Sequence, residues 1–156
     1  FFMNNNFNNV YNNLVNLTRN KDLYQNFDEQ DTFSDRLIFL LLHFAFFLKV
    51  LKNDKNKDLL QKIYDHVFRQ LELSIREIGY GDQSINKKMK DYINIFYGML
   101  DKIHMWDGLS KDVKKTILLT FIDKKVNEIE LVEYFDKYSE DLSNNTLNYY
   151  LKGVIK

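Results

Sequence analysis

The chain contains no cysteine and no proline, and only five of its 156 residues are glycine. Without cysteine there is no disulfide framework, no thiol nucleophile and no cysteine-ligated zinc site. Basic and acidic residues both number 22, so no net charge attracts the chain to DNA. The longest apolar run, Leu37 to Leu48, is shorter than the ~20 residues that cross a bilayer. These absences argue against a secreted disulfide scaffold, a DNA-binding protein and a membrane span.

Hydrophobic residues make up 45% of the chain and aromatic residues 15%. Apolar residues recur at helical spacing along the sequence, and no segment alternates with a period of two. The sequence therefore predicts an all-α, single-domain multi-helix bundle over residues 1–156, with residues 1–6 frayed. Residues 34–51 are apolar nearly all round, which predicts a helix buried on most sides at the centre of the bundle.

The segment 57–78 has the most regular helical pattern. Its apolar rows repeat every seven residues, which favours near-parallel packing against a neighbouring helix. Gly79 is expected in the left-handed position that ends a helix, and Asp82 or Ser84 is expected to cap the next one. Further helices are predicted to begin at a Ser110 cap and to cover residues 128–138 and 143–151.

Charged residues are balanced in number but clustered in sequence. Two groups of lysines and one group of carboxylates stand apart, which predicts one basic end and one acidic end. The lysines are Lys49, Lys52, Lys55 and Lys57, then Lys87, Lys88 and Lys90; the acids are Glu128, Glu130, Glu133, Asp136, Glu140 and Asp141.

No motif for catalysis or cofactor binding is present. Gly79-x-Gly81 is a poor phosphate loop, because it follows a helix and lacks a third glycine and a P-loop lysine. The three histidines are spaced for no common metal motif, and no carboxylate sits in a recognisable acid–base context. The sequence therefore predicts a protein that is not an enzyme and holds no metal or cofactor.

Two residues allow more than one interpretation. His43 lies within the apolar helix, where it is either a hydrogen-bonded core residue or an axial haem ligand. Gly98 lies inside a predicted helix at a cost of ~1 kcal/mol relative to alanine. It indicates either the close approach of another helix or a surface kept small for a partner.

Three short segments follow one another in a specific order: residues 75–82 read IREIGYGD, residues 87–90 read KKMK, and residues 96–98 read FYG. They are similar to the segments LRE(L/M)GVGD, K(R/K)MK and FYGR of the ubiquinol–cytochrome c chaperone family. Upstream, Asp31-Thr32, Arg36 and His43 resemble its DT…gRF……H segment. The chain departs from the pattern at Tyr80, where a small apolar residue is usual, and at Met99, where arginine is usual.

The resemblance implies an all-helical, non-enzymatic assembly chaperone of the cytochrome bc1 complex, with newly made cytochrome b as its client. It also implies that some relatives work with a small partner chaperone or at a ribosome. The expected location is the cytoplasmic side of the bacterial inner membrane or the matrix side of the mitochondrial inner membrane. A haem- or lipid-binding helical protein, or a permanent accessory subunit of a respiratory complex, remain as alternatives.

The partner surface is expected on the Arg76–Asp82 turn and the adjoining face of the next helix. There the glycines would shape the turn, Arg76 and Asp82 would fix it or pair across the interface, and aromatic residues would supply contact area. The basic end is expected to meet a ribosome or membrane surface. Arg36 and His43 are assigned a structural or a ligand-binding role. The residues assigned to the partner surface are Arg76, Glu77, Gly79, Gly81, Asp82, Lys87, Lys88, Met89, Lys90, Phe96, Tyr97 and Gly98.

Overall fold

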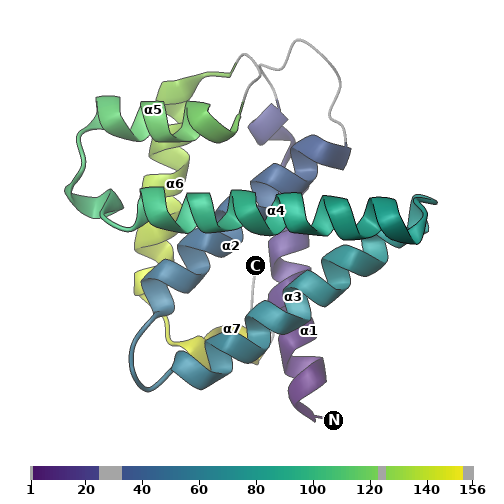
Figure 1. Ribbon diagram of the computed structural model, residues 1–156. Coiled ribbons are helices and arrows are strands. Elements are labelled where there is room, and N and C mark those ends of the chain that lie inside the picture. Colours follow the sequence, from purple (N-terminus) through teal and green to yellow (C-terminus); the bar gives the residue numbers. More distant parts are fainter. Residues whose placement is uncertain (1, 25–32, 123–125, 153–156) are drawn as a thin grey trace.

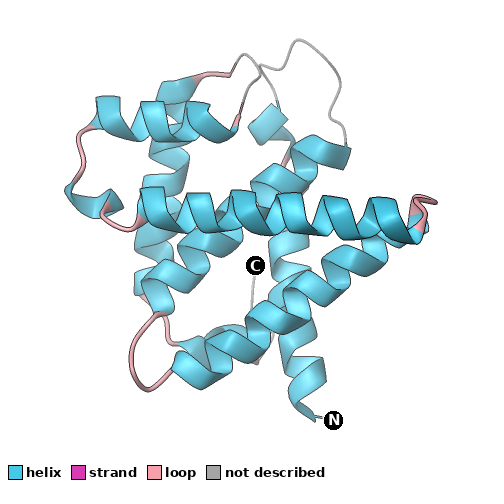
Figure 2. Cartoon of the chain, in the orientation of Figure 1, coloured by secondary structure: helices cyan, strands magenta, loops and turns pink. Residues whose placement is uncertain are grey.

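The computed structural model describes residues 2–24, 33–122 and 126–152, with side chains from residue 6 onward. Within these ranges the chain is helical and contains no strand (Figure 2), which confirms the all-α prediction. The helices in chain order are α1 (Phe2–Thr18), η1 (Lys21–Tyr24), α2 (Phe33–Leu51), α3 (Lys57–Glu77), α4 (Asp82–Ile103), η2 (Trp106–Gly108), α5 (Lys111–Phe121), α6 (Glu128–Ser143) and α7 (Leu147–Leu151).

Helix α2 is the centre of the fold, as its all-round apolar pattern predicts. It packs against α1, α4 and α6, and α4 crosses it in Figure 1. On one side Phe44 stacks on Phe96 of α4, with ring centroids 5.3 Å apart. On another side Phe46 stacks on Phe135 of α6 at 5.1 Å. A helix with neighbours on several sides has no face left for water, which is why its sequence lacks a polar stripe.

Helix α1 begins at Phe2, and the expectation that residues 1–6 are frayed stays a prediction. The helix is held by its apolar face, on which Phe7, Val10 and Leu14 are buried. Because adding residues to a formed helix is easier than starting one, a well-packed segment extends toward its end. Residue 1 lies outside the described residues.

Helices α3 and α4 form a V that opens away from the short turn at residues 78–81 (Figure 1). Against α4, this arrangement differs from the near-parallel packing with a neighbouring helix that the sequence predicts for α3. Its buried aliphatic positions Leu60, Ile63, Val67, Leu71 and Ile75 are spaced by 3, 4, 4 and 4 residues, and His66 and Phe68 are buried as well. That repeat is longer than the about 3.5 residues of a coiled coil, so the buried stripe does not follow a parallel neighbour.

Helix boundaries agree with the sequence where a cap is present. Ser110 accepts a hydrogen bond from the backbone N–H of Val113, as predicted for the start of α5. At α4 the predicted caps are wrong, because Gly81 occupies the N-cap position and makes no side-chain cap bond. Helix α6 continues to Ser143 instead of ending near residue 138, because Leu142 is still buried. None of the helices in the described ranges could cross a membrane, being either too short or too polar.

Candidate interaction surfaces

The turn between α3 and α4 is held by contacts of its own side chains. Gly79 has a φ of +102°, which confirms the left-handed position predicted for it. The guanidinium of Arg76 donates to Asp82 Oδ1 at 2.9 Å across the turn. The ammonium of Lys88 lies over the Tyr80 ring, 4.5 Å from its centroid. Arg76 and Asp82 therefore fix the turn within the chain, as one of the two predicted roles requires.

Two apolar side chains remain exposed at this turn, and a third, Leu73, is exposed on α3 before it. Leu73, Ile78 and Tyr80 are 46%, 49% and 41% exposed. Lys87 and Lys90 are exposed nearby on α4, and neither forms an ion pair within the described part of the chain. We call Leu73, Ile78, Tyr80, Lys87 and Lys90 the turn surface. It combines apolar contact area with two cations, a composition that suits contact with another molecule.

Other predicted members of the partner surface lie elsewhere. Phe96 is fully buried between Phe44 and Phe68, and Met89 is also buried, so neither supplies contact area. An amphipathic helix buries one face, and both residues lie on the buried face of α4. Glu77 is exposed at the last position of α3.

Gly98 lies beneath helix α5. A Cβ atom added there would be 3.7 Å from the ring of Phe121, an ordinary van der Waals contact. Of the two interpretations of this glycine, the structure supports the approach of another helix. There is nevertheless room for a methyl group.

A groove lies toward the open end of the V, between α2, α3 and α4. It has a volume of about 450 Å³ and an apolar floor that includes Leu48, Leu60 and Leu100. The hydroxyl of Tyr64 donates to that of Tyr97 at 3.3 Å, which joins the two arms of the V. Burial and this hydrogen bond raise the pKa of Tyr64, so its hydroxyl is neutral. We call this site the V groove; its lining is Leu48, Lys49, Lys52, Lys57, Leu60, Gln61, Tyr64, Tyr97, Leu100 and His104.

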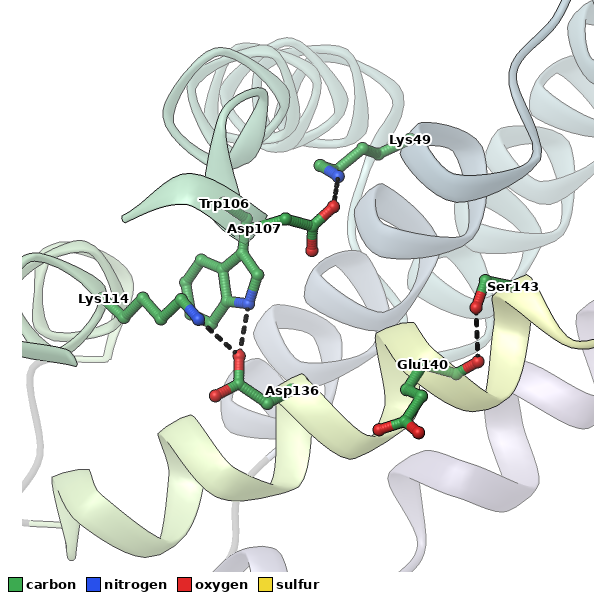
Figure 3. A network of polar contacts seen from close by, with 7 residues as sticks. All are labelled: Lys49, Trp106, Asp107, Lys114, Asp136, Glu140 and Ser143. Carbon is green, nitrogen blue, oxygen red and sulfur yellow. Dashed lines mark hydrogen bonds and ion pairs between the residues drawn. The ribbon is translucent and has the colours of Figure 1, made fainter. Parts of the chain in front are cut away.

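The V groove is basic at its margin. Its lining includes three lysines and no carboxylate. Lys49 Nζ is 3.1 Å from Asp107 Oδ2 (Figure 3), whereas Lys52 and Lys57 are exposed and form no ion pair within the described residues. The connector that presents these two lysines is ordered by Asn56, whose side chain donates to the Leu51 carbonyl at 2.7 Å.

The two lysine groups lie at opposite ends of α3. Lys52 and Lys57 precede or begin the helix, whereas Lys87 and Lys90 follow the turn at its other end. The 21 residues of α3 span about 31 Å. The prediction of a single basic end is therefore wrong: the chain has two basic patches, because the length of α3 separates the two segments that carry the lysines.

The acidic helix α6 has one inward-facing carboxylate that the sequence did not single out. Asp136 Oδ1 accepts from Trp106 Nε1 and from Lys114 Nζ, each at 2.8 Å (Figure 3). The same ammonium lies 5.2 Å from the Trp106 ring. Burying a lysine requires a paired charge, and Asp136 supplies it. Glu130, Glu133, Glu140 and Asp141 are exposed.

His43 is a core residue in this structure. Its Nδ1 lies 2.6 Å from the Phe39 carbonyl and its Nε2 lies 2.6 Å from the Tyr134 hydroxyl. Because a carbonyl only accepts, Nδ1 carries the proton and Tyr134 donates to Nε2. Burial lowers the pKa of His43 from 6.5 to about 4. Both nitrogens are thus engaged and the ring is neutral, which supports the interpretation of His43 as a hydrogen-bonded core residue. Arg36 is exposed near the start of α2.

The V groove is a candidate site that sequence reasoning missed. Its lining residues recur at positions 57, 60, 61 and 64 and again at 97, 100 and 104, spacings that place each set on one face of a helix. This signal is present in the sequence. The spacing indicates a groove only once the two helices are known to diverge over α2.

These features define a class: an all-α protein whose exposed apolar turn and lysine-rimmed groove suit contacts with other macromolecules. The family model described as "Ubiquinol-cytochrome C chaperone" matches residues 25–153. The chain therefore belongs to the ubiquinol–cytochrome c chaperone family.

A solved structure agrees with this assignment. The fold is similar to that of the Cbp3 homolog from Brucella abortus, with a TM-score of 0.78 and 26% sequence identity. The similarity covers 97% of this chain and 87% of that chain. No curated protein matches the sequence significantly.

Proposed function

We propose that this protein is a non-enzymatic assembly chaperone of the cytochrome bc1 complex that holds newly made cytochrome b through the turn surface. The observation that supports the assembly role is the family match over residues 25–153. The choice of the turn surface rests instead on the exposed residues of this chain. Its site of action would be the cytoplasmic face of a bacterial inner membrane or the matrix face of a mitochondrial one.

The composition of the turn surface suits a membrane-protein client. Leu73, Ile78 and Tyr80 present apolar area that an emerging apolar helix can cover. Lys87 and Lys90 are cations without an ion-pair partner in the described residues. Near an anionic leaflet each such cation contributes about 1 kcal/mol of attraction. The surface would thus hold the client where it enters the membrane.

Site-specific photo-crosslinking in cells that translate cytochrome b tests the client and the surface together. A crosslinker at Tyr80 is expected to capture cytochrome b. The matched control is a crosslinker at Tyr149, another exposed tyrosine, which lies on α7 and is 37% exposed. Equal capture from both positions, or none from Tyr80, would contradict the proposed surface.

Charge reversal tests the cationic part. Lys87→Glu combined with Lys90→Glu is expected to reduce co-purification of the protein with membranes and client, because two cations become anions. Unchanged co-purification would show that these lysines have no such role. Comparing the protein's abundance in assembly intermediates and in mature bc1 complex separates a chaperone, which leaves, from an accessory subunit, which stays.

A further inference from the structure

We propose that the V groove is a second docking site, distinct from the turn surface, and that it binds an acidic amphipathic helix of a partner protein. The two surfaces lie at opposite ends of α3. Occupation of the V groove therefore leaves the turn surface accessible, and the inference does not depend on the identity of the client.

The charge of the V groove selects the charge of its occupant. Lys49, Lys52 and Lys57 line it, and no carboxylate does. Of these, only Lys49 has a carboxylate partner within the described residues, Asp107, which is itself 74% exposed. Lys52 and Lys57 thus present two uncompensated cations beside an apolar floor. An occupant with carboxylates flanking an apolar face satisfies both features.

The dimensions of the V groove suit a helix. Along α3 its lining extends from Lys57 to Tyr64, and along α4 from Tyr97 to His104. Seven residues of helix rise about 10.5 Å, so both walls have this length. A bound helix that contacts the groove through positions i, i+3, i+4 and i+7 also spans about 10.5 Å. One such set of apolar side chains fits over Leu48, Leu60 and Leu100.

The client's membrane-flanking segments are poorer occupants. Segments on the cytoplasmic side of membrane proteins carry an excess of lysine and arginine, which the lysines of the V groove would repel. An anionic lipid offers the right charge. It does not explain the match between the groove's length and one apolar face of a helix, and the groove is concave, so a flat bilayer cannot reach its floor.

Fluorescence anisotropy with synthetic helical peptides tests the proposal on the full chain. The probe is a labelled peptide of about 14 residues with leucine at i, i+3, i+4 and i+7 and glutamate on both flanks. An isomer with lysine in place of glutamate is the comparison. The acidic peptide is expected to bind at least about tenfold more tightly than the basic one, and more weakly as salt is raised.

The decisive variant is Lys52→Glu with Lys57→Glu. Both residues are exposed, so the fold tolerates the change, and affinity for the acidic peptide is expected to fall at least about tenfold. The matched control is Lys62→Glu with Lys102→Glu, which makes the same charge change at exposed positions of α3 and α4 outside the groove lining. The control is expected to change affinity less than about threefold.

Three results would overturn the proposal. These are no binding of the acidic peptide, equal binding of both peptides, or equal loss of affinity in the two lysine variants. A further experiment uses phosphatidylglycerol vesicles. If the acidic peptide does not bind, and Lys52→Glu with Lys57→Glu abolishes binding of the protein to the vesicles, the ligand is an anionic lipid and the proposal is overturned. None of these outcomes changes the result expected for crosslinking from Tyr80. The proposed function is therefore tested separately from the V groove.

Discussion

Two adjacent residues of α4 belong to two different regions of the molecule. Phe96 is fully buried in the aromatic core around α2, whereas Tyr97 is 55% exposed and lines the V groove. One polar residue of the core, His43, has both ring nitrogens hydrogen-bonded. The second region is formed by α3, α4 and the connectors before and between them, and we call it the α3–α4 arm. It exposes apolar and cationic side chains that have few partners. The core therefore maintains the fold, and the arm is available for contacts with other molecules.

The two regions also differ in whether their lysines are buried and paired with a carboxylate. In the core region Lys114 is buried and paired with Asp136, at 2.8 Å. On the arm, Lys52, Lys57, Lys87 and Lys90 are exposed, with no ion pair among the described residues. Surface charges add little to stability whether or not they are paired. Substitutions of the arm lysines are therefore expected to affect binding and not folding.

The largest expected difference between the regions comes from Phe96→Ala and Tyr97→Ala. The first opens a cavity beside Phe44 and Phe68 and is expected to lower the free energy of unfolding by about 3–5 kcal/mol. The second removes a half-exposed ring and its bond to Tyr64, with an expected cost under about 1 kcal/mol. Urea denaturation of both variants measures the difference. Similar losses would mean that the core does not end where the structure places its boundary.

An intermediate effect is expected from pH, through His43. Its pKa is about 4 when folded and 6.5 when unfolded, so only the unfolded chain takes up a proton between these values. Stability is therefore complete above pH 6.5 and falls as pH decreases toward 4, by about 2 kcal/mol at pH 5. His43→Gln should remove this part of the pH dependence. Urea denaturation at pH 5 and pH 8 checks it; an unchanged slope in His43→Gln would contradict the buried, neutral ring.

The smallest expected effect concerns the two glycines of the turn. Gly79→Ala places a side chain at a φ of +102° and is expected to cost about 1–2 kcal/mol. Gly81 has a φ of −75° with no atom near the added Cβ, so Gly81→Ala should change stability by less than about 1 kcal/mol. Thermal denaturation compares them. If Gly81→Ala costs as much as Gly79→Ala, backbone conformation is not what selects glycine at this turn.

Much of the fold follows from local pattern. The apolar segment 34–51, the glycine that ends α3 and the Ser110 cap each depend on neighbours in sequence, and all three predictions are confirmed. The division of the chain into one domain stays a prediction. Among the candidate site residues, Arg76, Gly79 and Asp82 lie together at the turn, but Phe96 and Met89 do not join them. Helical spacing alone does not show which side of α4 faces the core.

Spacing along the chain was enough to determine the all-helical architecture, the central position of α2 and membership of the family, because helix formation and motif order are properties of nearby residues. Only the tertiary structure decided that α3 and α4 diverge, that the lysines form two patches and that a groove lies between the arms. Those features depend on how helices cross one another, and the crossing is set by packing between side chains far apart in sequence.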